Sequence, residues 1–451
     1  MSWLKQPEYL PEEDDPSRYR RLRWQVFVGA FLGYAGFYLV RKNFSMAIPF
    51  LTNFGFEKGE LSIVLSMNAA AYAISRLLMG GVSDRSDSRK FLPLGLILAA
   101  VAMFFMIVPI QWLGAERKSA AILLMCVLNF GVGWFNGMGY PPCTRIVTHW
   151  FSSRERGTMM AIWNCSHNIG GALVGPMAVY GAMWFGSWFY ATDSSRYYLV
   201  GTFAFPSAVA MLIALIVYCL VRDTPQSQGL CSIEKFKNDY PPAYGASHEV
   251  TLPWKEIMVT YILKNKLLWC IALADAFVFM VRYGCLDWAP AYLSEVHHYD
   301  IKKAGWAYFA YEFAAIPGTL LCGWLADRFF ARKRSVLAIA YMVASALAVV
   351  IYWQASSITL INMSLIFIGF FIYGPIMLLP VQSMDHVPKN ASGAAVGLIG
   401  FATYLLGTAL LANVALGYIV QVFGWNASFF AVVAACAVAI LFLLPVMKRE
   451  G

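Results

Sequence analysis

The chain has 451 residues, of which 59% are hydrophobic and 13% are charged, whereas an ordinary soluble domain has about 25% charged residues. The formal net charge is +9, but the basic residues are spread over short turns between apolar runs and form no nucleic-acid-binding patch. The composition therefore excludes a soluble globular domain and indicates a polytopic membrane protein. A β-barrel is excluded because no long alternation of polar and apolar residues occurs.

Twelve apolar segments follow one another along the chain, each close to the length of about 20 residues that a helical span needs. Their approximate centres are Gly36, Ala71, Ala99, Val132, Gly170, Val209, Val278, Gly318, Val343, Phe371, Leu406 and Ala437. We therefore predict an all-α membrane protein with twelve transmembrane helices in two bundles of six.

The turns between these segments predict the division of the chain. Residues 1–23 form a polar arm that ends in a basic run, which suits the cytoplasmic headgroups. Residues 24–222 make the first six-helix bundle, residues 223–264 a Pro- and Gly-containing linker, and residues 265–451 the second bundle with a short tail.

The basic residues are biased to one side of this arrangement. With both termini on the same side, that side carries 23 of the 34 Lys and Arg, and the opposite side carries six. This bias places both termini in the cytoplasm. The first residues are polar and acidic, so no signal peptide is expected, and the nine Cys lack paired spacing, so we expect neither a disulfide framework nor a metal site.

Three features of the first half recur in the second half in the same order. They are Arg41 and Arg282 at 241 residues apart, Asp84 and Asp327 at 243, and Gly157 and Gly393 at 236. Such parallel repeats describe a known transporter plan, in which the substrate binds near the membrane midplane between the halves.

Arg41 and Arg282 lie well inside apolar segments, where a cation costs at least about 2.5 kcal/mol and usually faces a cavity or a partner. A guanidinium stays protonated and presents a planar fork of donors that matches phosphate oxygens. We therefore expect one anion to be held by both arginines. The alternative is that each arginine pairs with a buried acid, for which Asp275 and Glu312 are the candidates.

The chain carries two DR motifs, at residues 84–85 and 327–328, and the motifs YLVRKNF, GMGYPPC, HWFSSRERG, IWNCSHNIGG, RDTPQSQGL, YGCLDWAPAYL and YEFAAIPGTLLCGW. Together they resemble those of the organophosphate:phosphate antiporters in the major facilitator superfamily. The resemblance covers nearly the whole chain. It implies a twelve-helix bundle with a central pore, rocker-switch alternating access, and import of an organophosphate in exchange for inorganic phosphate.

The resemblance also implies roles for individual residues. The two substrate arginines of the family match Arg41 and Arg282, and its binding-site histidine matches His167. A lysine of the family falls at Arg76, which keeps the charge and changes the donor geometry. Sugar-phosphate members carry a charged residue near Ile399, so its absence here favours glycerol 3-phosphate over a hexose phosphate.

Other polar residues in the predicted spans have open roles. Lys42 lies beside Arg41 on a different helical face, which favours a helix interface or the outer rim over ligand contact. Arg76 either attracts the entering anion or pairs with an acid. Asp275 stands where close relatives usually have an amide, and is a counter-ion, a proton-coupling site or a local substitution. Tyr38 and Tyr404 match pore positions of the family.

Two further tyrosines, Tyr34 and Tyr373, could offer hydroxyls to the substrate or could serve packing alone. The four residues of the DR motifs are expected to act as conformational latches at the cytoplasmic face; they are Asp84, Arg85, Asp327 and Arg328.

No phosphate-cradling loop of an ATP-driven pump occurs, and no catalytic grouping stands out within the spans. We therefore expect a transporter that works without a cofactor, and the family resemblance implies a monomer in the bacterial inner membrane. Phosphoglycerate and hexose 6-phosphate remain alternative substrates. A membrane receptor that senses external sugar phosphate is the alternative of another class.

Overall fold

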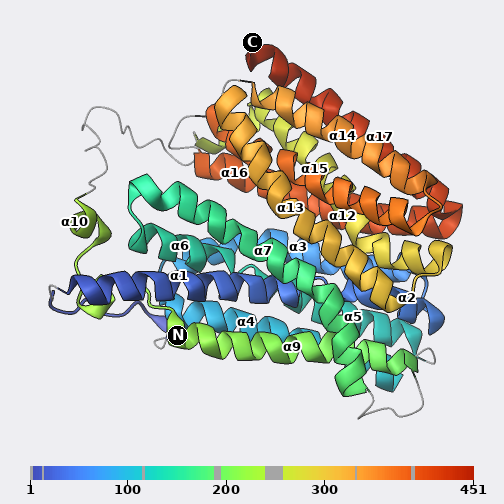
Figure 1. Ribbon diagram of the computed structural model, residues 1–451, viewed down its shortest axis with the longest axis horizontal. Coiled ribbons are helices and arrows are strands. Elements are labelled where there is room, and N and C mark those ends of the chain that lie inside the picture. Colours follow the sequence, from blue (N-terminus) through green and yellow to red (C-terminus); the bar gives the residue numbers. More distant parts are fainter. Residues whose placement is uncertain are drawn as a thin grey trace.

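The computed structural model describes residues 4–12, 15–113, 117–186, 194–238, 257–330, 333–387 and 392–450. These residues form a bundle of helices, and the described chain holds no strand beyond an isolated bridge between Lys5 and Ser86. Residues 239–256 of the predicted linker lie outside the described residues. The helices of the first half pack side by side, as do those of the second half, and the two groups diverge toward one end of the molecule (Figure 1).

The first half runs from the N-terminal arm to the linker. Its elements are α1 (Pro16–Leu39), α2 (Asn43–Asn53), α3 (Lys58–Ser83), α4 (Ser88–Phe104), the π-helix η2 (Pro109–Leu113), α5 (Lys118–Asn136), α6 (Tyr140–Trp150), α7 (Ser153–Gly181), the π-helix η3 (Ala182–Gly186) and α9 (Ser194–Leu220). The short elements η4 (Gln226–Gln228), α10 (Ile233–Lys237) and η5 (Ile257–Leu263) follow.

The second half contains the longer helices. Its elements are α12 (Lys266–His297), α13 (Ile301–Phe329), α14 (Arg334–Gln354), α15 (Ile358–Asp385), α16 (Ser392–Phe401), the π-helix η7 (Ala402–Ala415) and α17 (Leu416–Glu450).

These elements match the predicted apolar segments, but several segments are broken. The first is divided between α1 and α2, and the fourth between α5 and α6. The eleventh runs through α16, η7 and the start of α17. The chain then turns at Gly424, whose φ of 78° and ψ of −178° are readily adopted only by glycine. The predicted all-α membrane fold is confirmed.

Eight stretches of the described chain are long and apolar enough to cross a membrane, and the last of them, residues 394–450, contains two predicted spans. The helices α1, α2, α3 and α7 are not among these stretches. Helix α1 begins with a run of basic residues, α2 has only 11 residues, and α3 and α7 carry the polar residues Arg76 and His167. Arg41 and Lys42 lie in the break between α1 and α2.

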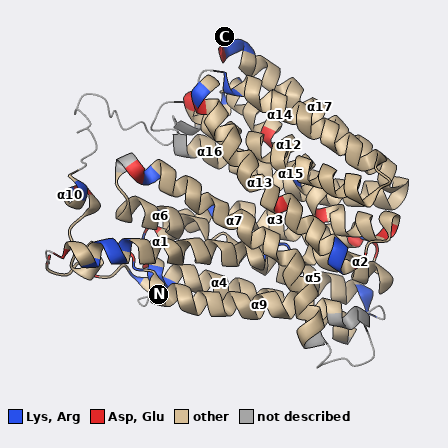
Figure 2. Ribbon diagram, in the orientation of Figure 1, with Lys and Arg blue, Asp and Glu red and all other residues tan. Residues whose placement is uncertain are grey.

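The two ends of the bundle differ. We call the end with Leu4–Glu12, loop 84–87 and α10 the termini end, and the end with residues 54–60, 298–300 and Gly424 the far end. Lys and Arg gather mainly at the termini end, and only a few charged residues lie in the middle of the bundle (Figure 2).

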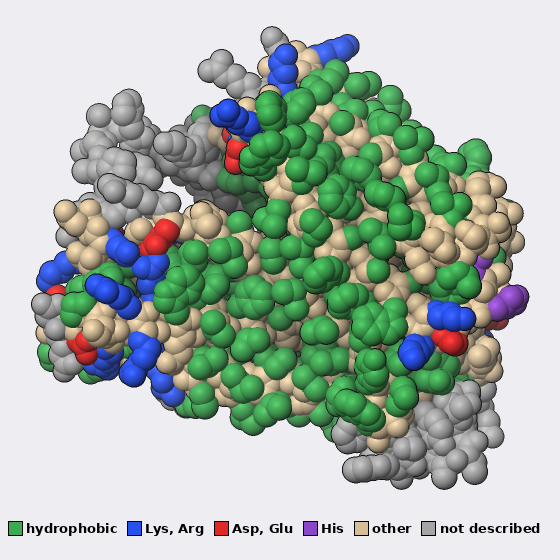
Figure 3. All heavy atoms as spheres, in the orientation of Figure 1, with side chains coloured by type: hydrophobic (Ala, Val, Ile, Leu, Met, Phe, Trp, Pro, Cys, Tyr) green, Lys and Arg blue, Asp and Glu red, His purple; other side chains and the backbone are tan. Residues whose placement is uncertain are grey.

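The surface between the two ends is apolar. Hydrophobic side chains cover the middle of the face seen in Figure 3, with charged groups toward its ends. Strongly exposed examples from both halves include Leu123, Leu212, Leu347 and Phe430, at 67%, 58%, 61% and 70% exposure. In water such a surface would be a liability, whereas in a bilayer it contacts lipid. The chain is a multi-pass membrane protein.

Candidate functional site

The first transmembrane segment is interrupted at its most polar point. Helix α1 ends at Leu39 and α2 begins at Asn43, so Val40, Arg41 and Lys42 form a non-helical break. Irregular backbone at membrane depth is tolerated only where protein or a cavity surrounds it. Transporters place binding sites at such interruptions.

Arg41 occupies this break and is only 3% exposed. The carbon of its guanidinium lies 3.8 Å from the ring centroid of Tyr72 and 5.1 Å from those of Tyr38 and Tyr404. Its Nε and Nη1 have no hydrogen-bond partner, and no described carboxylate pairs with it. Three aromatic faces therefore stabilise a cation that keeps most of its donors unused.

Arg282 lies within the continuous helix α12 and is 2% exposed. Its Nη2 donates to the hydroxyl of Tyr373 and lies 3.8 Å from Oε1 of Glu312. The Tyr373 hydroxyl in turn donates to Oε2 of Glu312 at 2.5 Å. The alternative, pairing with a buried acid, is thus present for Arg282, through Glu312 and not through Asp275. Its Nε remains without a partner.

A cavity of about 340 Å³ lies between the halves. Its ionisable and hydroxyl-bearing lining residues come from both halves: Tyr34, Tyr38, Arg76, Tyr140, His167, Asp275, Arg282, Thr319, Tyr373, Thr403 and Tyr404. Arg41 is not among the lining residues, since the rings of Tyr38 and Tyr404 lie over it on the cavity side. Substrate sites in proteins are commonly of this size or somewhat larger.

This cavity continues toward the termini end. A second cavity of about 360 Å³ shares Arg76, Tyr140, Val396 and Gly400 with the first and reaches Asp84. Asp84 is exposed in the loop at that end. The two cavities therefore adjoin, and together they reach the termini end of the molecule.

The far end is closed by contacts between the halves. Lys42 forms a buried ion pair with Asp287, with Nζ at 2.7 and 3.0 Å from the two carboxylate oxygens. Lys58 pairs with Glu295 at 2.6 Å. A Cβ atom on Gly175 of α7 would overlap the carbonyl oxygen of Gly305 of α13, so the two backbones touch there.

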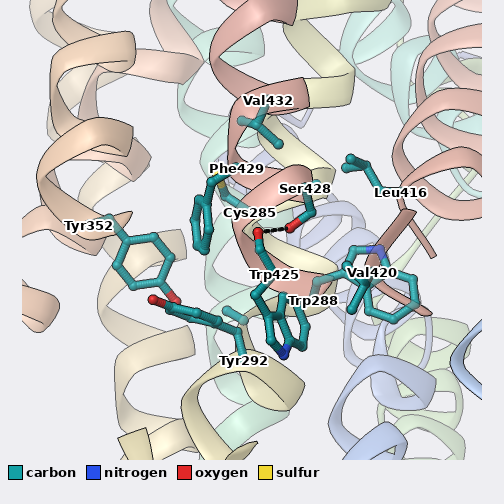
Figure 4. A pocket seen from close by; sticks show the side chains of 12 residues that line it. Cys285, Trp288, Tyr292, Tyr352, Leu416, Val420, Trp425, Ser428, Phe429 and Val432 are labelled. Carbon is teal, nitrogen blue, oxygen red and sulfur yellow. Dashed lines mark hydrogen bonds between the residues drawn. The ribbon is translucent and has the colours of Figure 1, made fainter. Parts of the chain in front are cut away.

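The aromatic pocket in Figure 4 is a different kind of space. It is lined by Trp288, Tyr292, Tyr352, Trp425 and other residues near the bend at Gly424, and Ser428 donates to the carbonyl of Trp425 at 2.7 Å. Its volume of about 20 Å³ has room for little more than one water. It is packing space of the second half and not a substrate site.

The family follows from comparison with known proteins. A profile of the Major Facilitator Superfamily matches residues 30–412. The chain belongs to the major facilitator superfamily. It is 44% identical over 438 residues to the glycerol-3-phosphate transporter of Bacillus subtilis, covering 97% of this chain and 95% of that protein. It is also 44% identical over 461 residues to the glycerol-3-phosphate transporter of Haemophilus influenzae, and the match covers 98% of this chain and 95% of that protein.

Solved structures agree on the fold. The bacterial homologue of the human lysosomal transporter Spinster, solved in an inward-facing and occupied conformation, has a TM-score of 0.69 at 16% identity. The match covers 97% of this chain and 98% of that one. The superfamily match and the 44% identity to a transporter over nearly the whole chain show that the chain belongs to a family of transporters and is not an enzyme, as predicted.

Three other residues predicted for the site also line the cavity. His167 lies at the cavity with its Nδ1 bonded to the carbonyl of Asn164, and its ring centroid is 5.1 Å from that of Tyr38. The guanidinium of Arg76 lies over the ring of Tyr140 at 4.4 Å. Asp275 lines the cavity and contacts Thr403.

The two DR motifs lie apart from the cavity that holds Arg282. Asp84, Arg85, Asp327 and Arg328 are all exposed. The main-chain carbonyl of Asp84 accepts a hydrogen bond from Nη1 of Arg145 at 3.0 Å. No ion pair joins the two motifs in the described residues, so their role as latches stays a prediction.

Sequence reasoning missed three residues of the site. Asp287, the partner of Lys42, is 245 positions from it, close to the 241-residue spacing of the two arginines. The repeat spacing does not predict this contact, but an acid in an apolar span is a signal that could have identified Asp287. Tyr72, under Arg41, and Thr403, beside Asp275, carry no such signal, because tyrosines and threonines are common in these spans.

Proposed function

We propose that the chain is a secondary transporter that imports glycerol 3-phosphate, or a similar small organophosphate, in exchange for inorganic phosphate. The phosphate would be held between Arg41 and Arg282 at the midplane of the bacterial inner membrane. Both termini would lie in the cytoplasm, so the termini end becomes the cytoplasmic end and the described conformation is open to the cytoplasm. The 44% identity to two glycerol-3-phosphate transporters supports the substrate.

The observation that carries this proposal is the state of Arg41. A buried guanidinium with two unused donor atoms and no carboxylate partner among the described residues holds an uncompensated positive charge. Leaving a charge in this state costs free energy that a bound anion would recover. A phosphate dianion supplies both the charge and the acceptor oxygens.

Alternating access follows from the same charges. Without a ligand, Arg41 and Arg282 repel each other across the interface between the halves. A bound dianion would attract both and favour a conformation in which the halves approach around it. Since a ligand shifts a conformational equilibrium only by its differential affinity, the two arginines must hold the anion more tightly in the closed arrangement. The rings of Tyr38 and Tyr404 must then move aside to admit the phosphate to Arg41.

The division at residues 223–264 and the monomeric state belong to the same proposal. Two six-helix bundles that move as rigid bodies need a linker long enough to let them rotate. Residues from both halves of a single chain line the described cavity, so the proposed site needs no second copy.

Exchange in proteoliposomes tests the function. Liposomes that contain the purified chain are loaded with labelled phosphate, and external glycerol 3-phosphate, 3-phosphoglycerate or glucose 6-phosphate is added. Rapid release by glycerol 3-phosphate at lower concentrations than the other two supports the proposal. Release by glucose 6-phosphate alone would overturn the substrate, and binding of glycerol 3-phosphate without any release would identify a receptor.

A further inference from the structure

Asp275 is an acid in a cavity that the proposed function assigns to an anion. It is 1% exposed, lines the cavity, and its Oδ1 has no hydrogen-bond partner. Its Oδ2 lies 2.8 Å from the hydroxyl of Thr403, but that hydroxyl also lies 2.5 Å from the carbonyl oxygen of Ile399. One proton serves two acceptors, so the carboxylate of this cavity-lining residue has unused hydrogen-bonding capacity.

Asp275 and Arg282 line the same wall of the cavity. The two residues are seven positions apart on α12, so they share a helix face and their Cα atoms are separated by about 10 Å along the axis. Phe279 lies between them, lines the same cavity, and has its ring centroid 5.5 Å from the Arg282 guanidinium. Along this wall the cavity therefore presents a guanidinium, a phenyl ring and a carboxylate in that order.

This order matches the groups of a phosphorylated polyol. A phosphate suits the guanidinium, a short carbon chain suits the ring, and hydroxyl groups suit the carboxylate, which accepts hydrogen bonds and donates none when ionised. A substrate whose far end is itself a carboxylate would place its negative charge beside that of Asp275. Such unfavourable contacts are how binding sites exclude a close analogue.

We propose that Asp275 selects the far end of the substrate, accepting hydrogen bonds from its hydroxyl groups and excluding organophosphates that end in a carboxylate. The proposal rests on the proposed function, because it takes the phosphate to be at Arg282. Thr403 is then a positioning residue that holds one oxygen of Asp275 and leaves the other for the substrate.

The test compares two substrates that differ only at that end. Proteoliposomes loaded with labelled phosphate receive external glycerol 3-phosphate or 3-phosphoglycerate, and the ratio of their half-saturating concentrations is measured. We expect Asp275→Asn to reduce the preference for glycerol 3-phosphate by about tenfold, or about 1.4 kcal/mol, mainly through tighter use of 3-phosphoglycerate. Asp275→Glu keeps the charge and should keep most of the preference.

Two controls separate this inference from folding and from the proposed function. The preference is a ratio of half-saturating concentrations measured within one variant, so a general loss of transport activity in Asp275→Asn does not alter it. Asp385→Asn removes an exposed acid that pairs with Arg334 outside the cavity, and should leave the preference unchanged. Absence of self-exchange in the wild-type chain would remove the proposed function itself.

Two other outcomes would overturn the role of Asp275 while leaving transport in place. The first is an unchanged preference in Asp275→Asn with normal self-exchange. The second is loss of self-exchange in Asp275→Asn despite a normal melting temperature, because the acid would then serve the transport cycle and not the choice of substrate. A preference of the wild-type chain for phosphoethanolamine over glycerol 3-phosphate would assign the carboxylate to an ammonium group instead.

Discussion

Arg41 and Arg282 hold equivalent places in the two repeats, yet their surroundings differ. Arg282 lies in an unbroken helix, lines the cavity, and has Glu312 and Tyr373 as partners. Arg41 lies in a helix break behind Tyr38 and Tyr404 with only aromatic faces around its charge. Equivalent positions in the two repeats therefore hold one arginine whose charge is balanced by a carboxylate and one whose charge is not.

This difference suggests an order of events. A phosphate that enters the cavity would meet Arg282 first, because Arg282 lines the cavity. There it would compete with Glu312 for the guanidinium. Arg41 would follow once its covering rings move. The following predictions test whether the two arginines differ in this way.

The largest effect is expected at the ion pair beside Arg41. Asp287→Asn leaves Lys42 buried without its carboxylate partner, which typically costs about 3–5 kcal/mol. The melting temperature of the purified protein in detergent should fall clearly. Replacing both residues together, as Lys42→Met with Asp287→Leu, should recover most of the lost stability. A single Asp287→Asn variant as stable as the wild type would mean that Lys42 finds another partner.

Arg41→Lys should reduce phosphate self-exchange by about 100-fold, equivalent to about 2.7 kcal/mol. An ammonium group lacks the planar fork of donors and is more strongly hydrated, so it would be poorly held among three rings. Arg334→Lys, at an ion pair remote from the cavity, is the matched control and should exchange normally. Normal exchange by Arg41→Lys would show that Arg41 needs only its charge.

Arg282→Lys should have a smaller effect, about tenfold on self-exchange, or about 1.4 kcal/mol. A lysine at this position can still be held by Glu312 and Tyr373 near the cavity. Initial rates over a range of phosphate concentrations would show the loss mainly as a higher half-saturating concentration. If Arg282→Lys left binding and exchange unchanged, the bidentate hold on the phosphate would have to be abandoned at this arginine.

Arg76→Lys is expected to change exchange by less than about threefold. The guanidinium of Arg76 lies over Tyr140 near the shared part of the two cavities, and no described acid pairs with it. A lysine there keeps the charge that attracts an entering anion. When the ionic strength is raised, the exchange rates of the wild-type chain and of Arg76→Lys should fall by the same factor. A loss as large as that of Arg41→Lys would make Arg76 part of the phosphate site.

Much of this arrangement could be predicted from the sequence, because a cation in an apolar span is costly and therefore conspicuous. Arg41, Arg282 and the repeat that relates them follow from spacing alone, and the all-α fold follows from hydropathy. The break around Arg41 could not be predicted, since no proline or glycine lies between Phe37 and Ala47. The ring of Tyr72 and the link from Tyr373 to Glu312 depend on helix packing, which local sequence does not specify.

The most direct test is an experimental structure of the chain with glycerol 3-phosphate bound. We predict one phosphate whose oxygens lie about 2.7–2.9 Å from guanidinium nitrogens of both Arg41 and Arg282, with the Tyr404 ring moved off Arg41. A phosphate bound to Arg282 alone, with Arg41 still covered by Tyr38 and Tyr404, would contradict the shared site between the two halves.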